Sequence, residues 1–101
     1  MVWIELMYKA ELSEVDQYLE AHHQYLSQYY NAGKFLFSGP TIPREGSIIL
    51  AQMDRVAAVQ VVKNDPFYIH GLADYRVVQF EPNRYGKSFA VLAKTKGKKY
   101  P

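Results

Sequence analysis

The order in which strand-type and helix-type hydrophobic patterns follow one another limits the possible folds of this chain more than any other sequence feature. Residues 2–8 are rich in β-branched and aromatic side chains, which favours a strand, whereas apolar positions recur at helical spacing over 13–31. Strand-like segments at 34–38 and 47–53 precede a short helix at 55–63 and an alternating strand at 75–81. These patterns predict an α+β sandwich with the ferredoxin-like βαββαβ plan.

Several residues suggest where these elements begin and end. Ser13 and Asp16 resemble a capping box, so we expect the first helix to begin at Ser13 and to end before Gly33. Asp54 is a suitable N-cap for the second helix, which we expect to break before Pro66 because the residue preceding a proline avoids the α region. We expect Gly39 and Pro40 to close the second strand. The third strand is nearly all apolar, which predicts a strand that is central or covered on both faces.

The size and composition of the chain exclude several classes of protein. The 101 residues form one domain, and no apolar run approaches the roughly 20 residues that span a bilayer. The N-terminus has no basic region before its apolar stretch, so we expect no signal peptide. With no cysteine, the chain has neither disulfides nor thiolate metal sites, and this composition fits a cytoplasmic location.

Charge is distributed unevenly along the chain. Residues 84–101 contain six basic residues and no acid, whereas residues 1–83 carry a net charge of −4. We therefore divide the chain into a domain at 1–82 and a basic extension at 83–101, in which residues 89–93 could form a short strand or helix. The extension has few aromatic residues between its charges and no known nucleic-acid motif, so we do not expect nucleic-acid binding.

His22 is the polar member of an otherwise apolar helical stripe. The other members of that stripe are Val15, Leu19, Leu26 and Tyr29. An imidazole that faces a core or cleft needs a hydrogen-bond partner, and it can act as a general base or acid near neutral pH. The sequence leaves two interpretations open, a packed structural histidine and a catalytic one.

Other candidate residues give weaker signals. Ser38 could offer its hydroxyl or backbone N–H to a ligand, or simply end a strand. Tyr25 belongs to a cluster of tyrosines that could line an aromatic pocket or pack in the core. His23 is expected to face solvent. No metal-binding motif or phosphate-binding glycine loop is present, so we expect neither a metal nor a nucleotide cofactor.

Three stretches of the chain resemble one protein family. They are His22-His23-Gln24-Tyr25-Leu26, then Asn31 to Pro40 with the sequence NAGKFLFSGP, and then Asn64-Asp65-Pro66-Phe67. In this order and at these separations they resemble the YciI-like (YCII-related) domain, over roughly residues 1–82. The basic extension departs from the family pattern.

The resemblance implies a fold whose sheets pair into a dimeric α/β barrel, with His22 facing Asp65 at a small catalytic site. A similar protein eliminates chloride from a chlorinated hydroxyquinone, and related isomerases move protons on small lactones. By this analogy, which extends only to His22 and Asp65, the chain is a small cofactor-independent lyase or isomerase that takes a small cyclic or unsaturated molecule. We further expect Ser38, Tyr25 and Phe67 to contact the ligand. The alternative is a non-catalytic dimeric module that binds a small ligand or has a structural role.

The predicted fold also favours a homodimer on physical grounds. Two helices can cover only one face of a four-stranded sheet, so the other face is bare in a monomer. Five residues are candidates for an apolar patch on that face: Trp3, Phe35, Phe37, Ile49 and Phe80. Such a patch is larger than a soluble monomer usually exposes, and we expect a partner sheet to cover it.

Overall fold

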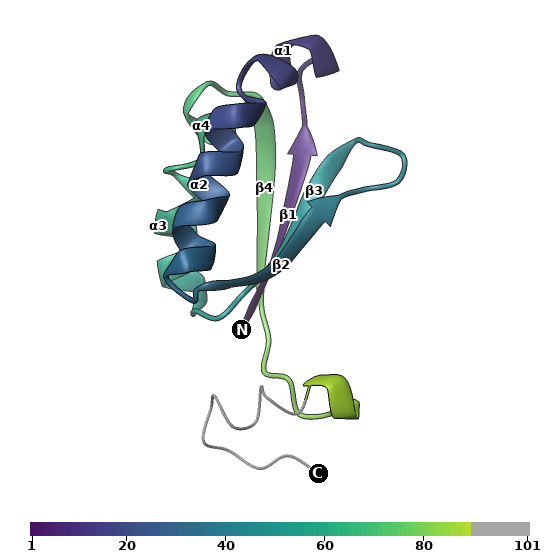
Figure 1. Cartoon of the computed structure of the whole chain (residues 1–101), viewed down its shortest axis with the longest axis vertical. Coiled ribbons are helices and arrows are strands. Elements are labelled where there is room, and N and C mark those ends of the chain that lie inside the picture. Colours follow the sequence, from purple (N-terminus) through teal and green to yellow (C-terminus); the bar gives the residue numbers. More distant parts are fainter. Residues whose placement is uncertain (90–101) are drawn as a thin grey trace.

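The computed structural model describes residues 1–89, which form a four-stranded antiparallel sheet with helices packed on one face (Figure 1). The strands stand in the order β2-β3-β1-β4, so β3 is central as predicted. Their bounds are β1 Val2–Tyr8, β2 Phe35–Pro40, β3 Gly46–Ala51 and β4 Ala73–Gln79. This is an α+β architecture of the ferredoxin-like type.

The helices occupy the connections from β1 to β2 and from β3 to β4. Their bounds are α1 Leu12–Gln17, α2 Leu19–Asn31, α3 Arg55–Val62 and α4 Pro66–Ile69, and a 3₁₀ helix, η1, spans Lys87–Phe89. Helices α2, α3 and α4 lie together over one face of the sheet, and no described helix covers the opposite face (Figure 1). The functional side chains described below lie between these helices and the sheet.

Alternation along the strands decides which side chains enter the core. On β1, Val2, Ile4 and Leu6 are fully or almost fully buried and point toward the helices. The helices contribute Val15 and Phe67 to the same cluster, and both are completely buried. Each large apolar side chain that is fully buried in this way stabilises the fold by roughly 1.5–3 kcal/mol.

The first predicted helix is two helices in the structure. The chain breaks at Tyr18, where φ is −111° and ψ is 9°. The predicted capping box is wrong: Glu11 is the N-cap of α1 and no side chain caps it, so Ser13 lies inside the helix. The Asp16 carboxylate accepts a 2.7 Å hydrogen bond from Arg44 instead, because the loop between β2 and β3 comes within reach of α1.

The later helix boundaries depend on two aspartates. Asp54 caps α3 as predicted, and its carboxylate accepts the backbone N–H of Ala57 at 2.8 Å. The segment from Asn64 to Phe67, predicted only as a break, instead begins the short helix α4. Asp65 is its N-cap and Pro66 follows inside the first turn, where a missing N–H disrupts no helical hydrogen bond.

The strand boundaries differ slightly from those predicted. Strand β2 continues through Pro40, which is tolerated because β2 is an edge strand and needs no second partner there. Strand β3 begins at Gly46, one residue early, and ends at Ala51 rather than at residue 53. A Cβ at Gly46 would lie 1.9 Å from the Leu6 carbonyl oxygen, so only glycine fits at this crossing.

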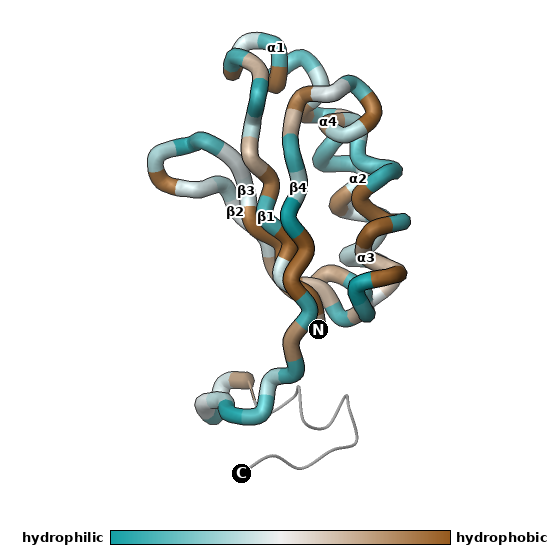
Figure 2. Tube along the Cα trace, turned by 180° about the vertical axis from the view of Figure 1, so that it is seen from behind, coloured by the Kyte–Doolittle hydropathy of each residue, from teal (hydrophilic) through white to brown (hydrophobic). Residues whose placement is uncertain are grey.

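The uncovered face of the sheet carries an apolar row that crosses all four strands. In the strand register Phe37 is opposite Leu50, Leu50 is opposite Trp3, and Trp3 is opposite Val78. Hydrophobic residues gather toward the end of the sheet where the N-terminus lies (Figure 2). Two residues predicted for this patch, Phe35 and Ile49, instead face the helices and belong to the main core. Phe80, also predicted there, is 41% exposed just beyond the end of β4.

Within residues 1–89 no helix is long and apolar enough to cross a membrane. Of the segment 89–93, whose structure the sequence left open, only Phe89 is described, and it ends η1. The remaining residues of that segment, and Lys94, Lys96, Lys98 and Lys99, lie outside the described part of the chain.

Candidate active site

Asp65 is a completely buried carboxylate at the first turn of α4. Burying a carboxylate away from water is costly unless its oxygens accept hydrogen bonds. Its Oδ1 accepts the backbone N–H of Phe67 at 3.0 Å, which is one of the N–H groups that a helix start leaves without a helical partner. This local backbone contact helps to fix the position of the Asp65 carboxylate.

His22 is the second donor to Asp65. It projects from α2, is 4% exposed, and its Nδ1 lies 2.8 Å from Oδ1 of Asp65. An ionised carboxylate can only accept hydrogen bonds, so in the neutral ring Nδ1 carries the proton and Nε2 presents a lone pair. The interaction joins residues 43 positions apart and fixes both the tautomer and the orientation of the imidazole.

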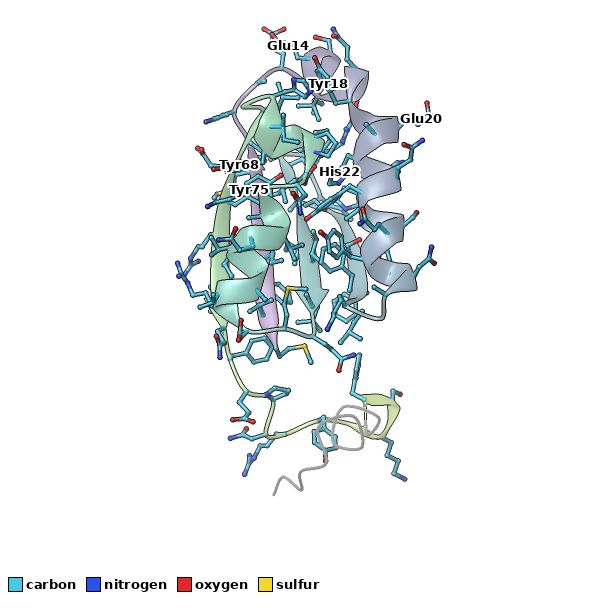
Figure 3. The ribbon with its side chains drawn as sticks, turned by 90° about the vertical axis from the view of Figure 1, so that its left-hand side faces the viewer. Glu14, Tyr18, Glu20, His22, Tyr68 and Tyr75 are labelled. Atoms are coloured by element: carbon cyan, nitrogen blue, oxygen red, sulfur yellow. The ribbon has the colours of Figure 1, made fainter. Side chains whose placement is uncertain are left out.

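Tyr75 is the third donor, and it comes from the sheet. Its hydroxyl donates a 2.6 Å hydrogen bond to Oδ2 of Asp65. His22 on α2 and Tyr75 on β4 point into the space between the helices and the sheet (Figure 3). Burial, together with the nearby Asp65 carboxylate, raises the pKa of Tyr75 well above its usual range. Tyr75 therefore remains a protonated donor throughout the physiological pH range.

Two aromatic rings stack beside the His22 ring. Phe67 stacks on it with centroids 4.1 Å apart and planes 10° from parallel, and the Tyr25 ring lies 6.0 Å away. The Tyr25 hydroxyl donates to the Val61 carbonyl oxygen at 3.2 Å. Burial, and to a lesser degree Asp65, raises the pKa of Tyr25 above its usual range. Tyr25 and Phe67 are predicted from the sequence to contact a ligand. Neither residue lines the cavity beside His22, and both rings instead pack next to the imidazole.

A cavity of about 300 Å³ lies beside His22. It is bounded by α2, β2, the start of β3 and the preceding loop, and its lining residues are Tyr8, Leu19, His22, His23, Leu26, Ser38, Gly39, Pro40, Arg44 and Ser47. Because Asp65 occupies Nδ1, Nε2 is the ring nitrogen left for a molecule in this cavity. The volume is near the lower end of the roughly 300–1,000 Å³ found for small-molecule sites.

Ser38 lies on the wall of this cavity, where the sequence predicted a ligand contact. Its Oγ is 2.5 Å from the Tyr30 hydroxyl, and either oxygen can be the donor. This contact leaves the serine hydroxyl with hydrogen-bonding capacity toward the cavity. Within residues 1–89 no three His, Cys, Asp or Glu side chains are grouped closely enough to hold a metal ion.

Comparison with known proteins identifies the family. The sequence model of the YCII-related domain matches residues 1–81. The chain belongs to the YCII-related domain family. The match covers the sheet and all four α-helices of this YCII-related domain and ends before η1. No curated protein matches the sequence.

The fold of this YCII-related domain is also found in a solved structure. The 5-chloro-2-hydroxyhydroquinone dehydrochlorinase TftG from Burkholderia phenoliruptrix AC1100, in complex with 2,5-dihydroxybenzoquinone, superposes with a TM-score of 0.67. The two sequences are 22% identical, and the alignment covers 87% of this chain and 98% of TftG. At this identity the comparison shows that the two proteins share a fold.

Three residues at the site of this YCII-related domain were not predicted from the sequence. Tyr75 could have been placed on the inner face, because Tyr75 and Val77 alternate along the last strand. No sequence pattern indicated that Arg44 belongs to the site, because Arg44 lies in a loop whose path such patterns do not determine. His23 was expected to face solvent; it is exposed, as predicted, but it also lines the cavity.

Proposed function

We propose that this protein is a small cofactor-independent enzyme that moves a proton on a small cyclic or unsaturated organic molecule, leading to elimination or isomerisation. The observation that carries the proposal is the hydrogen bond between His22 Nδ1 and the buried Asp65 carboxylate, beside a cavity that His22 itself lines. A histidine oriented in this way by a carboxylate has the arrangement expected of a general base. The solved dehydrochlorinase of the same fold supports this class of reaction.

The proposed step needs no external oxidant or metal. His22 Nε2 removes a proton from a carbon of the substrate, and the electron pair of that C–H bond forms a carbon–carbon double bond. In an elimination, the leaving group on the adjacent carbon departs with its own bonding pair, and the protonated imidazole returns the proton to solvent. In an isomerisation, an existing double bond to the adjacent carbon opens as the new one forms, and its electron pair takes the proton back from the imidazole at another carbon of the same molecule. Asp65 orients the ring and stabilises its cationic form.

The decisive experiment is a screen of small phenols, hydroxyquinones and lactones with the full chain and three variants. His22→Gln removes the base, and we expect turnover to fall about 10²–10⁴-fold while the fold is retained. Asp65→Asn is expected to reduce turnover as well, but it also alters the cap of α4, so its folding must be checked. His70→Gln is the matched control, because His70 is an exposed histidine at the end of α4 and lies outside the cavity lining.

One outcome of this screen distinguishes an enzyme from a non-catalytic binding module. If a ligand binds in the cavity but no conversion depends on His22, the protein is a non-catalytic ligand-binding domain and the enzymatic proposal is wrong. Retained activity in the His22→Gln variant would also contradict the proposed base.

We also propose that the protein acts as a homodimer that pairs the uncovered sheet faces. The apolar row formed by Phe37, Leu50, Trp3 and Val78 supports this arrangement, and Phe37 is 44% exposed in the single chain. Met1 and Leu36 pack in one cluster with Leu50 and Trp3 of this row, and Met1 and Leu50 are buried within it. A second copy of this face would bury it in the way that sheet-to-sheet packing requires.

A further inference from the structure

The cavity beside His22 carries basic side chains and no acid. Arg44, His22 and His23 line it together with the apolar side chains Leu19 and Leu26, and none of its lining residues is Asp or Glu. Asp65 lies behind the His22 ring and is not part of the lining. A cavity with this lining favours a ligand that has an apolar body and a negatively charged group.

Arg44 is held in place by contacts with Asp16 and with Tyr8, which also lines this cavity. Its Nη2 donates a 2.7 Å hydrogen bond to Oδ1 of Asp16 on α1, and its guanidinium carbon lies 5.5 Å from the centre of the Tyr8 ring. Neither Asp16 nor any other acid accompanies Arg44 in the cavity lining. A guanidinium has five N–H donors, so the contact with Asp16 leaves others available for a ligand. The contacts with Asp16 and Tyr8 raise the pKa of Arg44 further, and the side chain remains a cation.

A neighbouring cavity, unlike the one beside His22, is lined by acidic side chains. It is about 440 Å³ in volume and shares Tyr8 and Arg44 with the first cavity, but Glu11 and Glu45 also line it. An anion entering this second cavity would meet two carboxylates near the same arginine. The acid-free cavity beside His22 is therefore the better place for a negatively charged molecule.

We infer that the His22 cavity takes a small anionic ring compound, whose carboxylate or phenolate oxygen binds Arg44 while its ring packs against the leucines of α2 that line the cavity, Leu19 and Leu26. This inference rests on the proposed function, because it takes the cavity as the substrate site. It adds the charge of the substrate and the residue that recognises this charge. Arg44 is then a specificity-determining residue, because planar guanidinium groups bind carboxylates through paired hydrogen bonds.

The test compares benzoate with benzamide, which has nearly the same shape but no charge. Each is titrated into the isotope-labelled full chain, and the backbone amide signals of Ser38, Gly39 and Ser47 report on the cavity. We expect benzoate to bind at least about tenfold more tightly than benzamide, the effect of one charge-assisted hydrogen bond. Arg44→Gln should remove this preference, and Arg44→Lys should keep part of it.

The matched control is Arg55→Gln, which removes one positive charge at the exposed start of α3, outside the cavity lining. It should leave the preference for benzoate unchanged. Equal affinities for the two probes, an unaltered preference in Arg44→Gln, benzoate shifts confined to the basic extension, or no benzoate binding at all would each overturn the inference. Arg44-dependent benzoate binding without any His22-dependent turnover would support the inference while contradicting the proposed enzymatic function.

Discussion

The Tyr75 hydroxyl donates to the one carboxylate oxygen of Asp65 that His22 does not use, at 2.6 Å. A single buried carboxylate thereby joins three parts of the fold, because His22 comes from α2, Tyr75 from β4, and the backbone N–H of Phe67 from α4. Each oxygen of Asp65 has at least one donor, as the burial of a carboxylate requires.

Tyr75 is expected to act as a positioning residue for the proposed reaction. Replacing Tyr75 by Phe leaves Oδ2 of the buried Asp65 without its donor, which should lower the free energy of unfolding by about 1–3 kcal/mol. Turnover should fall less than in His22→Gln, because the base itself is retained. Thermal unfolding and kinetics measured together check this prediction. Tyr68→Phe is the control, since the Tyr68 ring lies beside Tyr75 and is 44% exposed; equal effects of the two variants would contradict the prediction.

Alkaline pH should destabilise the fold through the same tyrosine. The pKa of Tyr75 is raised in the folded state, so the folded state favours the neutral phenol. The stabilisation is complete below the pKa of an unfolded tyrosine, about 10, and is lost progressively as the pH rises above that value. Unfolding followed between pH 8 and pH 11 should therefore show a smaller alkaline loss of stability in Tyr75→Phe than in the wild type. Identical pH profiles for the two proteins would refute this assignment.

Gly46 is expected to be intolerant of any side chain. The Cβ of an alanine at this position would overlap the backbone carbonyl of Leu6, which cannot move without disturbing the pairing of β1 and β3. Gly46→Ala should lower the free energy of unfolding by roughly 1–3 kcal/mol, as overpacking does in a core. Gly39→Ala provides the comparison within β2, because a Cβ at Gly39 meets no atom within 4 Å. The prediction fails if chemical denaturation gives the two variants equal stability.

The proposed dimer can be tested on the apolar row of the uncovered sheet face. Phe37→Lys places a charge where a partner sheet would pack, so it should shift the protein from dimer to monomer. Light scattering on the wild type should give twice the chain mass of 11.7 kDa, and the variant should give the chain mass itself. Val56→Lys is the control, because Val56 is 75% exposed on α3 and lies away from that face. A wild-type protein that is monomeric at micromolar concentration would rule out the dimer.

The sheet could be predicted because its first strand is rich in β-branched and aromatic residues, its third is a short apolar run, its last alternates clearly, and glycine and proline mark several strand ends. The break between α1 and α2 could not, since Tyr18 is neither a proline nor a glycine and nothing in the spacing of apolar residues marks it. Helix α4 had a usable signal, because an aspartate directly before a proline is a common way to begin a helix.

The candidate site could also be predicted only in part from the sequence. The apolar stripe on the first helical segment singled out His22, but the pairing with Asp65 came from the family resemblance, because no periodic pattern links residues 43 positions apart. Arg44 and its contact with Asp16 depend on the path of a loop, and loop paths follow from tertiary packing rather than from local sequence pattern.

Asp65 both binds the His22 imidazole and caps α4, and these two roles restrict how the site can be modified by protein engineering. The oxygen that binds Nδ1 of His22 is also the oxygen that caps α4, so any exchange of Asp65 alters a helix start and a candidate active site together. Tyr75 has no such link to the backbone of α4, and it contacts the other oxygen. A designer who wants to change how firmly the imidazole is held, without rebuilding the neighbouring helix, should therefore begin with a library at position 75.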